Sequence, residues 1–177
     1  MLPGHVRVPR DKALGPLTEW PGFAEGAWWV QDAAAAIPAR LLRAGPGMTA
    51  LDLCAAPGGK TLQLAAAGAT VTALDRSPVR LKRVEENLAR VALTAEVIAA
   101  DAMDWKDART FDAVLLDAPC SGSGVAGRHP DAKWLRRNDD VYALARTQKR
   151  LLKALWPLLK PGGRLLYGTC SVFALEN

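Results

Sequence analysis

Cysteine, histidine and long apolar stretches are scarce in this chain of 177 residues. Its three cysteines include no CxxC pair and it has only two histidines, so we predict no metal site. Because an odd cysteine count suits a reducing compartment better than a disulfide framework, we expect a cytoplasmic protein. No apolar stretch approaches the roughly 20 residues of a membrane span. The charged, proline-interrupted start also lacks the apolar segment of a signal peptide, and we therefore expect no membrane partner.

The composition is that of a globular domain. Half of the residues are hydrophobic and 23% are charged, which does not match a disordered chain. The net charge of +5 favours a polyanionic partner. Residues 1–26 are rich in proline and glycine and are predicted to form a loop-rich segment, followed by a single domain over residues 27–177.

Strand patterns recur along that domain. Near-continuous apolar runs, typical of strands covered on both faces, occur at residues 50–54, 70–75, 96–100, 113–117 and 164–169. Helical patterns alternate with them. This alternation predicts a doubly wound α/β fold with a mostly parallel sheet, whose ligand lies at the carboxyl ends of the strands.

The predicted helices carry start and stop signals. An alanine-rich helix interrupted by Pro38 is predicted over residues 32–43. Ser77 is placed to cap a second helix. Asp139 and Asp140 open a third, and the sequence Pro-Gly-Gly at residues 161–163 is predicted to end it and turn the chain into the last strand.

A glycine-rich loop follows the first predicted strand. It comprises Cys54, Ala55, Ala56, Pro57, Gly58, Gly59 and Lys60. Small residues let the backbone approach a ligand, and the helix that follows offers free N–H groups at its positive end. A tight turn without a ligand is the alternative. A nicotinamide dinucleotide site is disfavoured because the loop lacks the three glycines of GxGxxG.

Acidic residues stand at the ends of the next two strands. Asp75 can accept hydrogen bonds from both hydroxyls of a ribose, and Asp101 can accept from an adenine amino group. Each also has an ordinary interpretation, as a charge at a helix N-terminus for Asp75 and as a loop aspartate for Asp101. Acids at successive strand ends together favour a ligand that contains adenosine.

Two cysteines, Cys120 and Cys170, each follow a predicted strand, in the contexts LLDAPCSGSG and LLYGTCS. Such a pair suits cytosine carbon-5 methyl transfer, in which one thiolate adds to the ring and a second thiol helps to release the adduct. A buried packing role is the alternative for Cys120, but its proline- and glycine-flanked turn favours an exposed thiol. Cys54, which ends a core strand, is predicted to pack. Spacing alone does not decide which thiol is the nucleophile.

Four ordered motifs, LDLCAAPGGKT, LLDAPCSGSG, RHPDAKWLRR and YGTCS, resemble the NOP/SUN family of RNA (cytosine-5) methyltransferases. The resemblance runs from about Gly22 to the end of the sequence. It implies a Rossmann-like methyltransferase fold, S-adenosylmethionine as the cofactor and RNA as the substrate. RHPDAKWLRR and the upstream GFAEGAWWVQD point, within the family, to a bacterial group that methylates small-subunit ribosomal RNA.

The resemblance also implies roles for single residues. Cys170 matches the family's nucleophile, and Cys120 matches the cysteine that assists release of the methylated product. The glycine-rich loop would hold the methionine side of the cofactor, Asp75 the ribose and Asp101 the adenine. Asp117 would lie between the cofactor and the target base.

A run of basic residues follows the first of these two cysteines. It comprises Arg128, Lys133, Arg136, Arg137, Arg146, Lys149 and Arg150. These side chains suit RNA phosphates, and a solvated helix face explains the same composition. The neighbouring cysteine loop and Trp134, a candidate for base stacking, favour RNA.

The chain departs from the family after Cys170, where it reads SVFALEN and the family reads closer to SVFPEEN. The family domain continues into a helix and an antiparallel strand pair, which we expect this chain to lack, together with the usual N-terminal RNA-binding domains. The last predicted strand would then be an uncovered apolar edge that promotes self-association. The alternative to an enzyme is a catalytically silent RNA- or cofactor-binding remnant.

Overall fold

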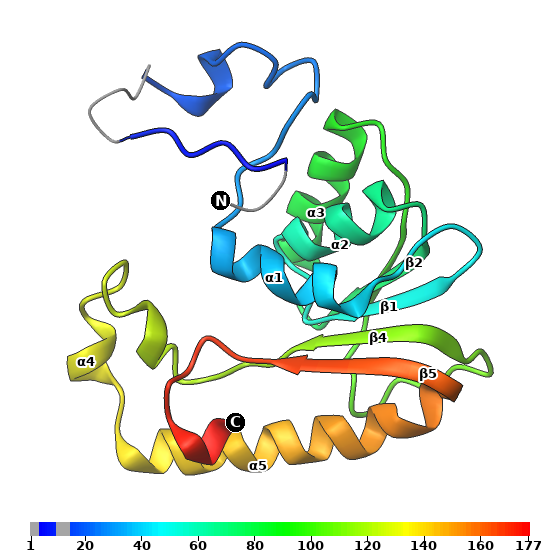
Figure 1. The fold of residues 1–177 in the computed structure, drawn as a ribbon. Coiled ribbons are helices and arrows are strands. Elements are labelled where there is room, and N and C mark those ends of the chain that lie inside the picture. The colour runs from blue at the N-terminus through cyan, green and yellow to red at the C-terminus, as the bar shows by residue number, and fades with distance from the viewer. Residues whose placement is uncertain (1–3, 10–14) are drawn as a thin grey trace.

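A five-stranded parallel sheet forms the centre of the protein. A computed structural model describes residues 4–9 and 15–177, without the side chains of residues 132 and 133. The strands are β1 (Thr49–Leu53), β2 (Thr70–Asp75), β3 (Glu96–Ala99), β4 (Phe111–Asp117) and β5 (Leu159–Gly168). They lie in the order β3-β2-β1-β4-β5, and every pairing is parallel (Figure 1). The predicted doubly wound α/β fold is therefore confirmed.

Helices cover both faces of this sheet. The α-helices are α1 (Ala33–Leu42), α2 (Gly59–Ala66), α3 (Pro78–Arg90), α4 (Ala132–Leu135) and α5 (Asn138–Leu155). Single 3₁₀ turns are η2 (Leu17–Glu19), η3 (Ser123–Val125), η4 (Trp156–Leu158) and η5 (Ala174–Glu176). Helices α1, α2 and α3 lie on one side of the sheet and α5 lies on the other (Figure 1). No helix within residues 4–9 and 15–177 is long and apolar enough to cross a membrane.

The apolar side chains of the central strands explain this layering. On one face, Leu53 of β1 and Leu116 of β4 pack with Leu151 and Leu155 of α5. On the other face, Leu115 of β4 belongs to the cluster that includes residues of α1 and α2. Because successive residues of a strand point to opposite faces, an apolar run such as Leu115-Leu116 supplies both halves of the core.

The predicted helix starts are confirmed. Asp32 accepts hydrogen bonds from the N–H groups of Ala34 and Ala35 at the start of α1. Ser77 accepts from the Arg80 N–H at the start of α3. Asp140, in the first turn of α5, accepts from the Arg137 N–H at 2.9 Å. Each side chain satisfies donors that the first turn of a helix leaves without a partner.

The Pro-Gly-Gly sequence at residues 161–163 does not end α5 as predicted. The helix ends at Leu155, Pro157 lies in the 3₁₀ turn that follows, and the chain already enters β5 at Leu159. Phe111 of β4 pairs with Leu159, whereas Ala113 pairs with Arg164, so residues 160–163 bulge out of the ladder. The glycines therefore serve a β-bulge, and the strand begins before the predicted residue 164.

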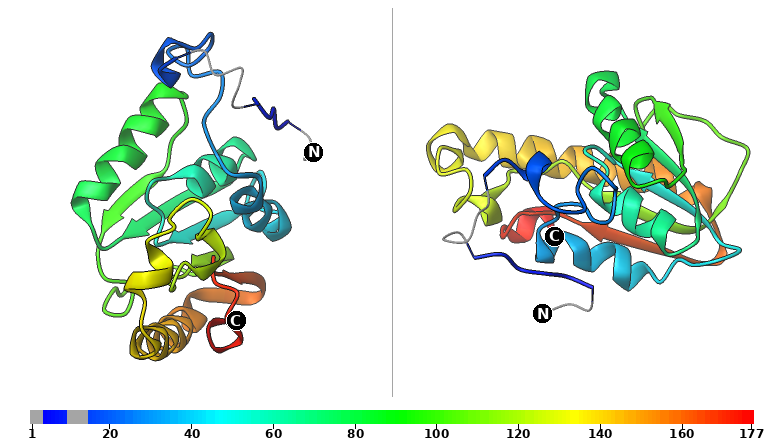
Figure 2. Two further views of the ribbon diagram at one scale, coloured as in Figure 1. Left: turned by 90° about the vertical axis from the view of Figure 1, so that its left-hand side faces the viewer. Right: turned by 90° about the horizontal axis from the view of Figure 1, so that it is seen from above.

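The segment before α1 meets the end of α3 around residues 23–28 (Figure 2). Phe23 stacks edge-on with Trp28 at 5.3 Å, and the Arg90 guanidinium lies 4.1 Å from the centre of the Phe23 ring. Arg90 also donates hydrogen bonds to the carbonyls of Phe23 and Trp28. Gly26, with φ of +71°, approaches α3 so closely that a Cβ would lie 2.0 Å from the Arg90 carbonyl oxygen. Residue 26 was the predicted end of the loop-rich segment, and residues on both sides of it, Phe23 and Trp28, contact Arg90 of the domain.

Candidate active site

The carboxyl ends of β1 and β4 border a cavity of about 420 Å³. Its wall is lined by Phe23, Trp29, Val30, Gln31, Asp32, Ala35, Asp52, Cys54, Ala55, Ala56, Pro57, Gly59, Lys60, Leu62, Asn87, Arg90, Asp117 and Arg128. Most of the predicted glycine-rich loop is among them. The site therefore lies where the alternation of strands and helices predicts a ligand.

The glycine-rich loop turns sharply from β1 into α2. Cys54 takes a left-handed conformation with φ of 57°, and Gly58, with φ of 105°, precedes the first residue of α2. A Cβ on Gly58 would lie 3.2 Å from a methyl carbon of Val84 in α3. The glycine is required here both by the backbone conformation and by the close packing of α2 on α3.

Asp75 holds this loop from behind. Its carboxylate accepts hydrogen bonds from the N–H groups of Ala56, at 3.2 Å, and Ser77, at 3.0 Å. Arg80 completes the arrangement, because its guanidinium lies 3.4 Å from the same carboxylate and donates to the Ala56 carbonyl at 2.6 Å. Only 2% of Asp75 is exposed, and it does not line the cavity. The structure thus shows it supporting the loop, and a contact with a ribose stays a prediction.

Asp101 lies outside the cavity wall as well. Its carboxylate accepts a hydrogen bond from the Met103 N–H at 2.9 Å, and its carbonyl accepts from Asp104 and Trp105. These are the contacts of a side chain that stabilises its own turn. The contact with adenine that the resemblance implies for Asp101 stays a prediction.

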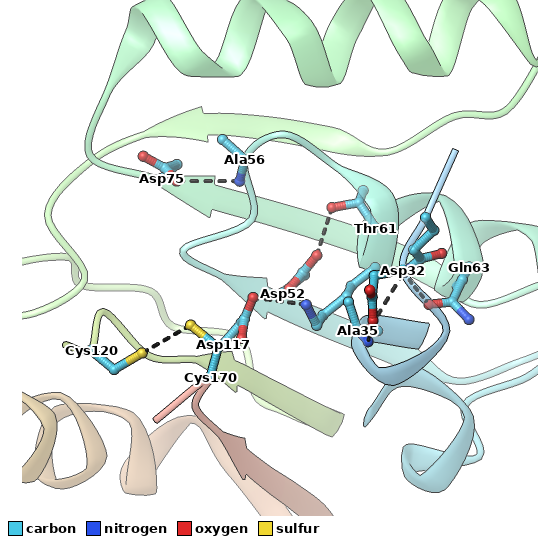
Figure 3. Close-up of polar contacts among 12 residues, drawn as sticks. Asp32, Ala35, Asp52, Ala56, Thr61, Gln63, Asp75, Asp117, Cys120 and Cys170 are labelled. Atoms are coloured by element: carbon cyan, nitrogen blue, oxygen red, sulfur yellow. Dashed lines mark hydrogen bonds and ion pairs between the residues drawn. The ribbon is translucent and has the colours of Figure 1, made fainter. Parts of the chain in front are cut away.

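Lys60 and Asp117 join the loop to the end of β4. The Lys60 ammonium donates to the Asp117 carboxylate at 2.8 Å (Figure 3). The Lys60 side chain is 13% exposed and that of Asp117 is 41% exposed, so the carboxylate is the accessible partner. Both residues line the cavity, and this pair stands where the cavity meets the cysteines.

Asp52 is a site residue that our sequence analysis did not identify. It is fully buried at the end of β1, and the Thr61 hydroxyl donates to its Oδ2 at 2.6 Å (Figure 3). Asp52 borders the cavity, and its buried Oδ1 has no hydrogen-bond partner among the described residues. Burial raises the pKa of Asp52 to about 7, although the Thr61 hydrogen bond and the charge of Lys60 lower it. An acid within an apolar strand was the available sequence signal.

Cys120 and Cys170 meet although they are distant in the sequence. Their sulfur atoms lie 3.2 Å apart, beside Asp117 (Figure 3). Cys120 follows β4 and Cys170 follows β5, so the parallel pairing of these strands brings the two thiols to the same end of the sheet. Cys170 is exposed and Cys120 is half-buried. Cys120 was predicted to expose its thiol, and the structure shows it partly buried and outside the core.

Each of the two thiols shifts the pKa of the other. The Cys170 thiol and the backbone N–H of Gly122 lower the pKa of Cys120 to about 6, against the effect of burial. The same sulfur contact, together with burial and the charge of Asp117, raises the pKa of Cys170 above its usual range. The two opposite shifts have the same main cause, the contact between the sulfur atoms, so they describe the pair and not either thiol alone.

The third cysteine behaves differently. Cys54 packs against the core cluster between the sheet and α5, as predicted. Burial, followed by the charges of Asp75 and Asp117, raises the pKa of the Cys54 thiol to about 12. It is therefore a neutral packing residue whose backbone shapes the glycine-rich loop.

The N-terminal wall of the cavity was also missed. Phe23, Trp29 and Gln31 line it, and Gln31 is fixed by hydrogen bonds from the Trp29 indole and to the Gln63 side chain. These residues lie in GFAEGAWWVQD, so the motif itself was the signal. Its aromatic residues supply apolar surface for a ligand at the mouth of the cavity.

Basic residues of the predicted run have several roles. Arg136 donates from Nε to the Ser121 carbonyl at 3.0 Å, and Arg128 lies 3.4 Å from Asp32. The Lys133 side chain is outside the described part of the structure. Three exposed residues of α5, Arg146, Lys149 and Arg150, form no ion pair within that part. A phosphate-binding surface is therefore best sought on α5.

The arrangement matches one known family over most of the chain. The model of the family described as 16S rRNA methyltransferase RsmB/F matches residues 39–177. The chain belongs to this family. Its members are S-adenosylmethionine-dependent methyltransferases, and the resemblance inferred from the four motifs is confirmed.

Relatives of the RsmB/F family are much longer than this chain. Ribosomal RNA small subunit methyltransferase B of Vibrio cholerae is 52% identical over 162 residues, which cover 89% of this chain and 37% of that protein. The protein of the same name from Cronobacter sakazakii is 49% identical over 181 residues, covering 98% of this chain and 42% of the relative. The chain thus spans about two fifths of the length of the curated relatives it matches.

Solved structures that are similar to this chain show the same fold. NSun6 from Pyrococcus horikoshii aligns with a TM-score of 0.83 and 32% identity, over 93% of this chain and 43% of that one. A methyltransferase homolog protein from the same organism aligns with a TM-score of 0.82 and 34% identity, over 93% and 53% of the two chains. The Rossmann-like methyltransferase fold is therefore confirmed.

Proposed function

We propose that this chain transfers a methyl group from S-adenosylmethionine to carbon 5 of a cytosine in small-subunit ribosomal RNA. The observation that carries the proposal is the contact between Cys120 and Cys170, whose sulfur atoms lie 3.2 Å apart beside a cavity. A cytosine-5 transfer needs a thiolate to add to the ring and a second group to complete release. The relatives from Vibrio cholerae and Cronobacter sakazakii are named ribosomal RNA small subunit methyltransferase B, which agrees with this substrate.

The cavity fits the cofactor. Its glycine-rich loop lies next to a helix N-terminus, and Asp52, which borders the cavity, has a buried carboxylate oxygen, Oδ1, that lacks a donor among the described residues. The ammonium group of the methionine portion is a suitable donor for that oxygen. Residues 54–60 would hold this portion, and Asp75 and Asp101 would serve the ribose and adenine, as the resemblance implies. When bound, S-adenosylmethionine supplies an electrophilic methyl group.

The cysteine pair provides the nucleophile. The two sulfur atoms lie 3.2 Å apart, and when the proton between them resides on Cys120, the Cys170 sulfur is the thiolate that adds to carbon 6 of the cytosine. Addition makes carbon 5 nucleophilic enough to accept the methyl group. The carbon-5 proton then passes to solvent water, and Cys120 returns its proton to the departing Cys170 sulfur, which restores the aromatic ring. Cys120, next to the adduct, assists this release.

Lys60 and Asp117 are placed to orient the pyrimidine ring. Their 2.8 Å ion pair stands next to the thiols, and the Asp117 carboxylate is accessible. A carboxylate can accept from the exocyclic amino group and an ammonium can donate to the ring carbonyl. Both contacts fix the ring and strengthen its electrophilic character at carbon 6.

Labelled methyl transfer tests this proposal. The chain is incubated with S-adenosylmethionine carrying a labelled methyl group and with transcripts of small-subunit ribosomal RNA, and digested nucleosides are analysed. Label in 5-methylcytosine supports the proposal. Retained cofactor binding without label in any nucleoside would favour the second candidate, a silent RNA- or cofactor-binding remnant, which the short span relative to the relatives makes relevant.

The exposed basic face of α5 is expected to bind RNA phosphates. Replacing Arg146 and Arg150 by Glu should lower the slope of log affinity against log salt concentration by about 1 to 2, because each lost phosphate contact removes roughly one released counterion. Fluorescence anisotropy with a labelled transcript measures this slope. The matched control exchanges Lys82 and Arg83, which are exposed on α3 across the sheet. Equal slopes for both double variants would contradict the assignment.

The β5 edge leads to a prediction about association. Strand β5 pairs with β4 on one side and with no strand of the described residues on the other, as the sequence analysis expected. We propose that the regular part of this open edge, from Arg164 to Gly168, recruits a second copy. Sedimentation velocity of this chain alone should give a coefficient that rises with protein concentration. A constant coefficient of a monomer would contradict this expectation.

A further inference from the structure

A buried carboxylate lies between the two cysteine loops. Glu176, at the end of η5, is 1% exposed. Its Oε1 accepts from the Ser121 N–H at 2.9 Å and from the Gln148 side-chain amide at 3.1 Å. Its Oε2 accepts from the Ser121 hydroxyl at 2.5 Å. Three donors therefore converge on one side chain that no step of the proposed chemistry uses.

These contacts fix the backbone on both sides of Cys120. Ser121, held by Glu176, follows Cys120 directly. Gln148 of α5 binds Glu176 and also donates to the carbonyl of Pro119, the residue before Cys120, at 2.9 Å. The Ser121 carbonyl accepts from Arg136. Glu176 is thus the centre of the contacts that place the Cys120 thiol.

Glu176 also contacts strand β5, which leads to Cys170. Its backbone carbonyl accepts from the Tyr167 hydroxyl, at 2.6 Å, and Tyr167 lies in β5, three residues before Cys170. The two cysteine loops also touch directly, because the Gly124 N–H donates to the Cys170 carbonyl at 2.9 Å. A Cβ on Gly124 would lie 2.7 Å from that oxygen. The loops are therefore fitted to each other, and Glu176 connects both.

The identity of the side chain matters. A neutral amide at position 176 offers only one acceptor oxygen and would present a donor to the Ser121 hydroxyl or to Gln148. Burial opposes the charge of Glu176, but its hydrogen bonds, led by that from Ser121, outweigh burial and lower the pKa of the carboxyl. An ionised carboxylate is therefore the group that satisfies all three donors at neutral pH.

We propose that Glu176 is a positioning residue that holds the Cys120 thiol at contact distance from the Cys170 thiol. Its relevance for methyl transfer rests on the proposed function, whereas its effect on the two sulfur atoms does not. Without the carboxylate, the Cys120 loop loses its anchor while the sheet, the glycine-rich loop and the cavity keep theirs.

The coupling of the two thiols tests this proposal without any methyl transfer. In mixtures of reduced and oxidised glutathione, Cys120 and Cys170 lose two protons and two electrons to form a disulfide, and one glutathione disulfide becomes two thiols. The equilibrium ratio, read by mass spectrometry, gives the effective concentration of one thiol at the other. Glu176→Gln should lower it by about tenfold to a hundredfold, the range for a lost hydrogen bond to a charged group.

Matched variants separate positioning from general stability. Leu175→Ala, at the exposed neighbour in η5, should leave the effective concentration unchanged. Ser121→Ala, which removes one donor and leaves the carboxylate bound to Gln148, should lower it less than Glu176→Gln does. Cofactor affinity should stay at the wild-type value in all three, and the rate constant of methyl transfer should fall in Glu176→Gln without a change in KM for the cofactor.

An unchanged thiol equilibrium in Glu176→Gln would overturn the proposal. A joint loss of thiol coupling and cofactor binding would overturn it too, because Glu176 would then stabilise the whole domain. Weaker coupling in Glu176→Gln, with no methyl transfer by the wild type, would support the positioning role and contradict the proposed function instead.

Discussion

Cys170→Ala is expected to abolish methyl transfer, with a fall in rate on the order of 10³-fold or more, while cofactor affinity is unchanged. The proposed nucleophile is lost, and removal of a covalent nucleophile typically costs at least this factor. The variant should fold, because Cys170 is exposed and lies in a loop beyond β5. It does not line the cavity that we assign to the cofactor.

The companion variant, Cys120→Ala, distinguishes the roles of the two thiols. It keeps the Cys170 nucleophile but removes the group that assists release, so a covalent protein–RNA adduct should accumulate. It also removes the neighbour that accepts the Cys170 proton at 3.2 Å. Adduct formation should therefore become dependent on hydroxide and should increase as the pH rises toward about 8.5, the ordinary pKa of a cysteine.

Denaturing gel electrophoresis and nucleoside analysis measure both results. Leu175→Ala, at an exposed residue outside the cavity, is the control. It should form no adduct and should retain transfer. An adduct that accumulates in Cys170→Ala and is missing in Cys120→Ala would reverse the assignment and make Cys120 the nucleophile.

The central strands could be predicted because each one is a continuous apolar run in the sequence. The strand predicted at residues 70–75 coincides with β2, and that predicted at residues 50–54 is shifted by one residue from β1. Strands covered on both faces need apolar side chains at every position, which gives a continuous run. The start of β5 had no such signal, because residues 160–163 bulge opposite Asp112 and the pairing depends on a distant strand.

The site residues that lie in short sequence motifs could be predicted from the sequence. The glycine-rich loop, Asp117 and the two cysteines come together as expected. Asp52 and Glu176 were missed, because a buried charge is recognised only once the surrounding residues are known. Similarly, a basic sequence does not reveal that Arg136 is engaged with the Ser121 carbonyl. Local patterns predict which groups are present, and tertiary contacts decide which of them are free.

Asp52 carries the second prediction with a large effect, on both stability and cofactor binding. Its pKa is raised to about 7 by burial, whereas in the unfolded chain an aspartate ionises near 3.9. Between these values the folded protein binds more protons than the unfolded chain, so its stability decreases as the pH rises and becomes level above about 7. This is the reverse of the behaviour of an aspartate in a salt bridge.

Asp52→Asn removes this titration and keeps an acceptor for the Thr61 hydroxyl. The free energy of unfolding of the variant, relative to the wild type, should therefore increase by about 2–3 kcal/mol between pH 5 and pH 8. Urea unfolding at a series of pH values measures it. Asp104→Asn, at an exposed loop position, is the control for a general effect of charge.

The same substitution should weaken cofactor binding even though it stabilises the fold. Asp52 borders the cavity and its buried Oδ1 lacks a donor among the described residues, whereas an amide in place of the carboxylate offers an ammonium group no charge. Affinity for S-adenosylmethionine should fall about tenfold or more at pH 8, the range for a lost charge-assisted hydrogen bond. Wild-type affinity should rise from pH 6 to pH 8 as Asp52 ionises, and that of the variant should not.

Calorimetric titration that finds equal affinities at pH 8 would show that the cofactor does not use this carboxylate. A gain in stability coupled to a loss of binding would identify Asp52 as a group whose burial destabilises the fold and serves the ligand.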